Sequence, residues 1–239
     1  MNETETAPKL EILYQDEDYV IINKPHGLLV HRSKMAANTN RFALQELRNQ
    51  LNRHVYPAHR LDRKTSGALV FTLTQEALKA VRQEFEKLAI TKTYWAIVRG
   101  YTEDEGCIDY ALTNDKGKLQ EAITRYRTLD RSEIDVPFGK HQTSRYSLVE
   151  VYPETGRMHQ IRKHLAHIFH PIIGDRPIGC NKQNKLFLEK WNMNTMLLHA
   201  KNISFHHYAL DKRISVSASI QPEFIRMIET LGFSKELLT

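Results

Sequence analysis

Short hydrophobic runs, separated by polar turn residues, extend along most of the chain. Alternating hydrophobic and polar positions predict β-strands, and the dense apolar run ALVFTL predicts a buried one. We expect strands over residues 12–14, 19–22, 28–30, 68–73, 93–98, 123–129, 145–152, 197–205 and 214–218. Residues 131–143, which include Pro137 and Gly139, predict a long connection between two of these strands.

Hydrophobic positions three and four residues apart predict helices in four other segments. We expect these helices over residues 42–51, 75–88, 158–168 and 223–231. Thr74 is the predicted N-cap of the second helix, and Pro171 stops the third because proline has no N–H for the helical hydrogen bond. A few helices among many short strands predict an α+β fold with a mixed, largely antiparallel central sheet and flanking helices.

The polar N-terminal segment, residues 1–9, is predicted to be a flexible tail. No internal repeat, low-complexity tract or Gly/Ser linker divides residues 10–239, so this part of the chain is predicted to form a single domain.

The composition narrows the class of protein. Of the 239 residues, 41% are hydrophobic and 26% are charged, as in an ordinary soluble globular protein. No apolar run approaches the ~20 residues needed to span a bilayer, and the acidic start MNETETAPKL does not resemble a secretory signal. Two cysteines, Cys107 and Cys180, build neither a disulfide framework nor a clustered zinc site. We therefore expect a cytoplasmic protein that does not insert into membranes.

Charge and missing motifs limit the partners and cofactors. The net charge of +6 suits a polyanionic partner such as RNA, although a mildly basic protein that binds no nucleic acid has the same value. Neither GxxxxGK[ST] nor GxGxxG occurs, so no nucleotide cofactor is expected. The histidines between residues 159 and 170 lack the HExxH pattern of a zinc hydrolase, so no metal site is expected.

The segment HRLDRKTSG places one carboxylate among several cations. Asp62 is surrounded in the sequence by Arg60, Arg63 and Lys64. Nearby positive charges favour the ionised form of a carboxylate, which suits a nucleophile or a base. A salt-bridged surface loop has the same composition, so these charges alone do not assign a reaction.

Two further segments contain candidate site residues. In the helix expected over residues 158–168, the apolar positions form one stripe that begins at Met158, and Arg162 lies on its edge. A guanidinium that faces the interior needs an ionised partner, for which Asp62 is the candidate; alternatively Arg162 extends to solvent along its aliphatic stem. Tyr94, in the strand expected over residues 93–98, either stacks on a nucleobase or packs in the core.

Taken together, three segments resemble the RluA-type pseudouridine synthase family, whose members isomerise uridine in structured RNA. They read HRLDRKTSG, KTYWAIVRG and GRMHQIRKH. The resemblance extends from about residue 10 to residue 233 and implies the fold of that family with its catalytic cleft. It also implies one catalytic domain with no appended RNA-binding module, and chemistry that needs no cofactor. The segments EILYQDE, NKPHGLLVHRS and HPIIGD resemble members that act on tRNA at uridine 65 of the T-stem.

The resemblance also implies roles for individual residues. Asp62 is the essential carboxylate, Arg162 its ion-pair partner, and Tyr94 the ring that stacks on the target uracil. Arg60 fills the gap left when the uridine is flipped out of its helix. Ile161 and Leu198 form apolar walls of the base pocket. Five cations are expected to contact phosphates: Arg63, Lys64, Lys92, Arg157 and Lys163.

The expected partner is therefore tRNA, bound by a monomer that needs no other protein. Three other functions remain open at this point. The first is a 23S ribosomal RNA pseudouridine synthase of the same family. The second is a non-catalytic RNA-binding or folding module, for which basic charge and aromatic residues suffice. The third is a metal-dependent nuclease that uses His159, His164, His167 and His170.

Overall fold

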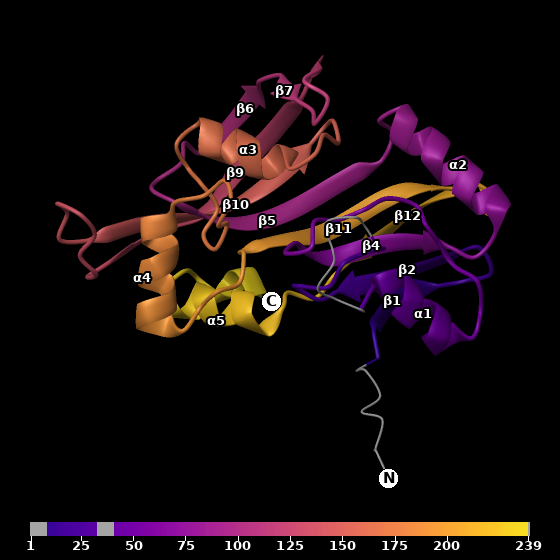
Figure 1. Cartoon of the computed structure of the whole chain (residues 1–239), viewed down its shortest axis with the longest axis horizontal. Helices are drawn as coiled ribbons and strands as arrows, with labels where there is room; N and C mark the ends of the chain where they lie inside the picture. Colours follow the sequence, from indigo (N-terminus) through magenta and orange to yellow (C-terminus); the bar gives the residue numbers. More distant parts are fainter. Residues whose placement is uncertain (1–8, 33–40, 239) are drawn as a thin grey trace, which may run out of the picture.

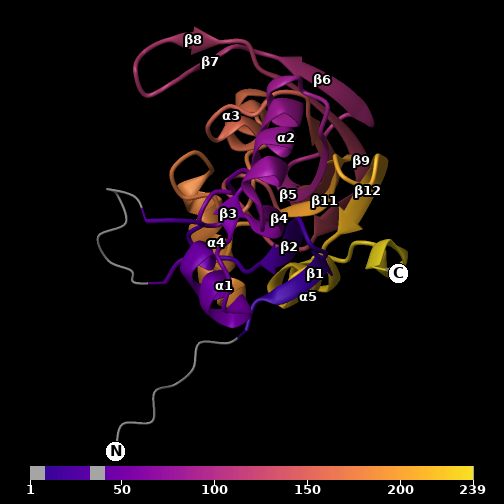
Figure 2. The ribbon, with the colours of Figure 1, turned by 90° about the vertical axis from the view of Figure 1, so that its right-hand side faces the viewer.

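A central sheet of ten strands, with helices on both faces, organises the molecule (Figures 1 and 2). The computed structural model describes residues 9–32 and 41–238, so the predicted tail, apart from Lys9, lies outside the described residues. The mixed sheet with flanking helices confirms the predicted α+β class. Within the described ranges no helix is long and apolar enough to cross a membrane.

Of the twelve strands in the described residues, eight form where the hydrophobic alternation predicts them. The twelve strands are β1 (Glu11–Gln15), β2 (Tyr19–Lys24), β3 (Tyr56–Pro57), β4 (Ser66–Thr72), β5 (Thr91–Arg99), β6 (Glu105–Asp109), β7 (Leu112–Thr113), β8 (Leu119–Gln120), β9 (Ile123–Ile134), β10 (Ser144–Pro153), β11 (Leu198–His207) and β12 (Lys212–Ser217). The predictions missed β3, β6, β7 and β8. The strand predicted over residues 28–30 is wrong, because Leu29 forms a single bridge to Phe42. The connection predicted over residues 131–143 is shorter, because β9 continues to Ile134.

The four predicted helices are confirmed, and the structure adds others. The helices are α1 (Ala43–Leu51), α2 (Gln75–Glu86), α3 (Gln160–His167), α4 (Asn181–Trp191), α5 (Pro222–Thr230) and a 3₁₀ turn (Lys235–Leu238). Thr74 caps α2 as predicted, since its side chain accepts a hydrogen bond from the N–H of Ala77 at 3.2 Å. The predictions missed α4, whose buried residues are Gln183, Asn184 and Phe187, so it shows no hydrophobic stripe.

The order of the strands brings two distant segments together at the centre of the sheet. The order is β1-β2-β4-β11-β5-β10-β9-β6, with β3 beside β4 and β12 beside β11. β4 and β11 run parallel, and Gly67 lies beside Ala200 there. Gly67 has φ +105°, and a Cβ at this position would lie 2.3 Å from the carbonyl oxygen of Ala200, so the close approach requires glycine. Asp62 therefore precedes a fixed junction in the middle of the sheet.

Each face of the sheet carries its own hydrophobic layer. In β4, Leu69 and Phe71 pack with residues of α1, whereas Ala68 and Val70 pack with residues of α2. Figure 1 shows α2 and α3 on one face and α1, α4 and α5 on the other. On its face α3 lies over β9 and β10, and its buried residues include Arg162.

Candidate active site

The loop between β3 and β4 carries Asp62 and is tied down on both sides. The N–H of Thr65 donates to the carbonyl oxygen of Asp62 at 3.1 Å, which closes a tight turn. The N–H of Gly27 donates to the carbonyl oxygen of Arg63 at 2.9 Å, and the Nε of Arg63 returns a hydrogen bond to Gly27 at 3.0 Å. These bonds fix the backbone that presents the Asp62 carboxylate.

A buried lysine supports the same loop. The Nζ of Lys24 donates to the carbonyl oxygens of Pro25, Leu28 and Arg63 at 3.0, 2.8 and 3.1 Å. Burial lowers the pKa of Lys24 to about 7, and the negative charge of Asp62 opposes that shift. The predictions did not include Lys24, because it follows the strand predicted over residues 19–22 and its sequence gives no signal of burial.

Arg162 of α3 joins two carboxylates that are far apart in the sequence. Its Nη1 donates to Oδ2 of Asp62 at 2.8 Å, while Nε and Nη2 donate to Oδ2 and Oδ1 of Asp175, each at 2.8 Å. Burial disfavours the charged guanidinium, but the hydrogen bonds to Asp175 and Asp62 outweigh that effect and raise the pKa of Arg162. The structure thus brings Asp62 and Arg162 together and places Arg162 inside the molecule rather than in solvent.

The positive charge beside Asp62 does not come from its neighbours in the sequence. In the described part of the chain, the cation paired with Asp62 is Arg162. The Nε2 of His159 lies 3.7 Å from Oδ1, but burial lowers the pKa of His159 and so disfavours its charged form. Arg63 points away to Gly27. Among the described residues, Arg60, Arg63 and Lys64 form no ion pair with the Asp62 carboxylate, although Arg60 lines the same cavity.

A cavity of about 350 Å³ opens beside Asp62. This volume lies in the range of small-ligand sites. Eight of the predicted site residues line the cavity: Arg60, Asp62, Lys92, Tyr94, Arg157, Ile161, Arg162 and Leu198. Three predicted residues do not line it: Arg63, Lys64 and Lys163. The Nζ of Lys163 instead lies 3.5 Å from the carbonyl oxygen of Thr113.

Apolar and aromatic side chains form the inner wall of this cavity. Ile161 and Leu198 are buried in the hydrophobic layer beneath α3, and Tyr94 packs against it. Burial and the negative charge of Asp62 raise the pKa of the Tyr94 hydroxyl, so the hydroxyl is neutral at physiological pH. Tyr94 is both a core residue and a cavity residue, because it packs against the hydrophobic layer and also lines the cavity.

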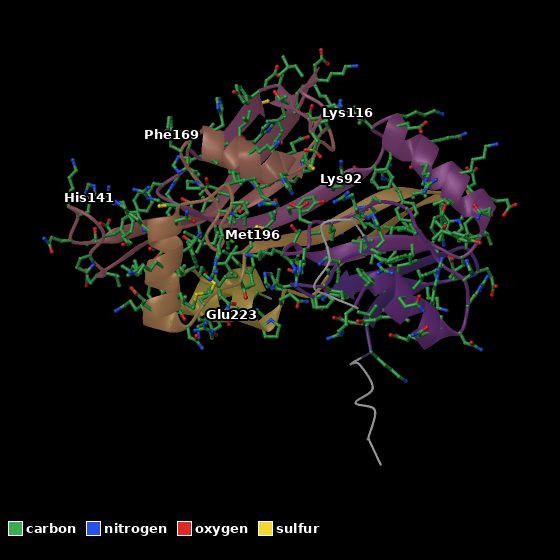
Figure 3. All side chains as sticks on the ribbon, viewed as in Figure 1. Lys92, Lys116, His141, Phe169, Met196 and Glu223 are labelled. Carbon is green, nitrogen blue, oxygen red and sulfur yellow. The ribbon has the colours of Figure 1, made fainter. Side chains whose placement is uncertain are left out.

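In the described part of the chain, Lys92 and Arg157 line the cavity without a charged partner. Lys92 of β5, labelled in Figure 3 between α3 and α2, donates to the carbonyl oxygen of Thr155 at 3.4 Å, and Arg157 donates to that of Glu121 at 2.9 Å. Among residues 9–32 and 41–238, no carboxylate lies within 4.0 Å of either side chain. Burial lowers the pKa of Lys92 to about 8. Both cations are available for an anionic ligand.

The segment before α3 is fixed by a glutamine that the predictions missed. The side chain of Gln160 accepts from the hydroxyl of Thr155 at 2.7 Å and from the N–H of Arg157 at 2.9 Å. Its amide donates to Ile123 and Thr124 of β9, each at 2.9 Å. These four bonds hold the Arg157 segment against the sheet.

The histidines and the methionine of this region differ from the expected pattern. His164 is buried between Thr124 and the carbonyl oxygen of Tyr110, and His167 stacks on Tyr110 with ring centroids 3.7 Å apart. In the described ranges no group of three candidate metal ligands occurs. Met158 was expected on the buried stripe, but it precedes α3 and is 39% exposed.

His59 of the same loop takes a supporting position. Its Nε2 accepts a hydrogen bond from the N–H of Val70 at 3.1 Å, and its ring lies against Phe85 with centroids 5.1 Å apart. Burial lowers the pKa of His59 to about 4, so the imidazole is neutral and able to accept that bond. The start of the Asp62 loop is thereby attached to β4.

The fold is that of RNA pseudouridylate synthases, as two solved structures show. The structure matches human RNA pseudouridylate synthase domain containing 4 with a TM-score of 0.72 and 25% identity, over 93% of each chain. It matches the fold of human RNA pseudouridylate synthase domain containing 1 with a TM-score of 0.70 and 20% identity, over 98% of each chain.

Sequence comparisons give the family. The model of the RNA pseudouridylate synthase family matches residues 18–167. The tRNA pseudouridine synthase C of Vibrio parahaemolyticus is 42% identical, covering 96% of this chain and 98% of its own length. That of Haemophilus influenzae is 40% identical, covering 94% and 98%. This chain therefore belongs to the RNA pseudouridylate synthase family, as the three sequence motifs indicated.

Proposed function

We propose that this protein converts uridine 65 in the T-stem of tRNA to pseudouridine without a cofactor. The observation that carries the proposal is the Asp62 carboxylate, which is held by Arg162 at 2.8 Å at the edge of a cavity of about 350 Å³. The relatives named tRNA pseudouridine synthase C, which cover nearly the whole chain, support tRNA as the substrate.

The reaction conserves all atoms, so the protein needs to supply only a charged group, a pocket and an orientation. The N1–C1′ bond of the uridine breaks, the uracil turns, and C5 forms the new bond to C1′. The proton that leaves C5 is balanced by the proton that N1 gains. Three routes use the carboxylate: attack at C1′, attack at C6, and proton removal at C2′. Each needs an ionised Asp62 that faces the nucleoside.

The cavity residues divide the binding of the nucleotide among them. A uridine in a stem must leave its stack, at a cost of a few kcal/mol. Tyr94 then stacks on the uracil, and Ile161 and Leu198 enclose its edges. Arg60, which is exposed at the cavity mouth, fills the gap left in the RNA helix.

Phosphate contacts follow the cations around the cavity. Lys92 and Arg157 line the cavity and would bind the phosphates next to the flipped nucleotide. Arg63, Lys64 and Lys163 lie outside the cavity and would contact phosphates further along the RNA. We further propose that residues 10–239 act as one catalytic domain, as a cytoplasmic monomer that needs no protein partner. The continuous ten-stranded sheet, which brings Asp62 and Arg162 to one cavity, supports the single domain.

The test is to incubate the protein with unmodified tRNA and 23S rRNA transcripts and to map pseudouridine in both. We expect pseudouridine at position 65 of tRNA and none in a matched transcript that carries cytidine there. Pseudouridine found only in the rRNA would show that the substrate is 23S rRNA and not tRNA. Binding of both RNAs without any pseudouridine would contradict catalysis and favour a non-catalytic RNA-binding module.

A further inference from the structure

Asp175 holds the Arg162 guanidinium more completely than Asp62 does. A guanidinium carries five N–H donors in one plane. Asp175 accepts two of them side by side, from Nε and Nη2, and its side chain is 1% exposed. Such a two-point contact fixes the plane of the guanidinium. With that plane fixed, Nη1 points at Oδ2 of Asp62.

The backbone of Asp175 is itself held by a residue of α4. The Oδ1 of Asn184 accepts from the N–H of Gly174 at 2.8 Å, and its Nδ2 donates to the carbonyl oxygen of Asp175 at 2.9 Å. Gly174 has φ +82°, and a Cβ there would lie 1.9 Å from the carbonyl oxygen of Thr195. The segment that carries Asp175 is therefore fixed on two sides.

Neither Asp175 nor Asn184 lines the cavity, so neither contacts a nucleoside bound there. We propose that Asp175 and Asn184 are positioning residues for the reaction: they orient the Arg162 guanidinium so that it holds Asp62 in its reactive position. This inference rests on the proposed function and extends it to α4, an element outside the cavity. The connection runs from Asn184 to Asp175, from Asp175 to Arg162, and from Arg162 to Asp62.

The first measurement separates turnover from binding. In Asp175→Asn, kcat on tRNA is expected to fall about 10²-fold, because misplacement of a catalytic group by about 1 Å has an effect of that size. In Asn184→Asp the acceptor for Gly174 remains and the donor to Asp175 is lost, so a fall of about tenfold is expected. KM for tRNA should change less than twofold in both variants. A KM that rises together with an unchanged kcat would contradict positioning and indicate RNA contact.

The second measurement tests whether Asp175 acts through Arg162. In an Arg162→Lys background the two-point contact with Asp175 cannot form. Once Asp175 is also replaced by asparagine, the lysine no longer pairs there and can turn to Asp62. Adding Asp175→Asn to Arg162→Lys should therefore leave kcat equal or higher. If Asp175→Asn lowers kcat by the same factor in both backgrounds, Asp175 supports the fold independently and the positioning role is wrong.

The third measurement needs no activity. The Nε–H of Arg162, assigned in the NMR spectrum by its loss in Arg162→Lys, should exchange slowly with water in the native protein because it donates to buried Asp175. Slow exchange should be lost in Asp175→Asn, reduced in Asn184→Asp, and retained in Asp62→Asn, because Asp62 binds Nη1. Slow exchange that persists in Asp175→Asn would overturn the inference. If the wild-type protein forms no pseudouridine, the proposed function is wrong. The NMR result does not depend on activity and would still report whether Asp175 holds Arg162.

Thermal unfolding of each variant provides the folding control. If Asp175→Asn does not fold, Asn184→Asp carries both the kinetic and the NMR tests, because it retains the Asp175 side chain and removes only the hydrogen bond to its backbone carbonyl. A folded Asn184→Asp protein with wild-type kcat and wild-type exchange at Nε would contradict the role of α4.

Discussion

One guanidinium holds two aspartates whose surroundings differ. Asp62 lies on the loop between β3 and β4, accepts one hydrogen bond from Arg162, and has a side chain that is 21% exposed. Asp175 lies on the loop between α3 and α4, accepts two hydrogen bonds from Arg162, and is 1% exposed. The Asp62–Arg162–Asp175 arrangement therefore has an open end, the partly exposed carboxylate of Asp62, and a closed end, the buried carboxylate of Asp175.

The difference shows how one residue type takes two roles. At Asp175 both oxygens are occupied by the guanidinium, and no nucleoside in the cavity reaches them. At Asp62, Oδ1 accepts no hydrogen bond from the described residues, and the Nε2 of His159 lies 3.7 Å from it, beyond hydrogen-bond distance. A carboxylate that reacts with substrate must keep one oxygen free. Exposure and bonding therefore separate the reactive aspartate from the positioning one.

The largest expected effect comes from neutralising the open end. Asp62→Asn keeps the shape of the side chain but removes its charge, so turnover should fall about 10⁴-fold or more, as when a catalytic carboxylate is lost. Because Asp62 is partly hydrated, the free energy of unfolding should change by less than about 1 kcal/mol. Tritium release from tRNA labelled at C5 of uridine measures the turnover. Equal release by wild type and variant would remove Asp62 from the reaction.

The second prediction concerns stability and compares the two ends directly. Arg162→Leu leaves the closed carboxylate of Asp175 buried without a charged partner, so the free energy of unfolding should fall by about 3–5 kcal/mol. Adding Asp175→Asn should recover most of that loss, whereas adding Asp62→Asn should recover little, because Asp62 is reached by water. Urea denaturation at neutral pH measures all three variants. Equal recovery by the two additions would show that the two carboxylates are equally desolvated.

The open end could be predicted from the sequence because its signals are local. The motif HRLDRKTSG and the buried strand that follows it mark Asp62 within a dozen residues, although the cations of this motif do not pair with the carboxylate. The partner Arg162 could be predicted as well, since a guanidinium on the edge of an apolar stripe needs an anion. Most strands and the four expected helices were predictable for a similar reason, because periodicity in hydrophobic residues reports directly on burial.

The closed end was not predicted, because no physical signal marks Asp175 as buried. The segment HPIIGD, which ends at Asp175, was noted only for its resemblance, and the carboxylate pairs with Arg162 across a loop. Its support, α4, buries polar Gln183 and Asn184 instead of a hydrophobic stripe. A useful signal was present in Arg162 itself, because one carboxylate cannot satisfy five buried N–H donors. The number of N–H donors on a buried Arg162 therefore predicts a second acceptor beside Asp62, which the structure shows to be Asp175.

The third prediction sharpens the comparison at the open end. Tyr94 lies near Asp62 with a neutral hydroxyl, since burial and the charge of Asp62 raise its pKa. Tyr94→Phe keeps the stacking ring and removes the hydroxyl, so KM for tRNA should be unchanged. If the hydroxyl assists the removal of the C5 proton, kcat should fall about 10²-fold, as for general acid–base groups. Tyr94→Leu is the matched variant that also loses stacking and should raise KM. A Tyr94→Phe protein with wild-type kcat would limit Tyr94 to stacking.

The smallest expected effect concerns Lys92 at the rim of the cavity. Unlike Arg162 in the interior, Lys92 has no carboxylate partner among the described residues. Lys92→Gln should weaken tRNA binding several-fold and reduce the slope of log affinity against log salt by about one, as when one phosphate contact is lost. Lys185→Gln, which changes an exposed lysine of α4 outside the cavity, should leave the slope unchanged.

The pH dependence of binding distinguishes this contact from general electrostatic attraction. Burial lowers the pKa of Lys92 in the free protein to about 8, so below that pH the ammonium is already charged and ready for a phosphate. Above pH 8 the lysine must take up a proton when tRNA binds, and wild-type affinity should fall as the pH rises from 7 to 9. The Lys92→Gln protein has no such proton to gain, so the difference between the two affinities should shrink across this interval. A difference that stays constant from pH 7 to 9 would place Lys92 away from the phosphates and leave Arg157 as the cavity cation that binds them.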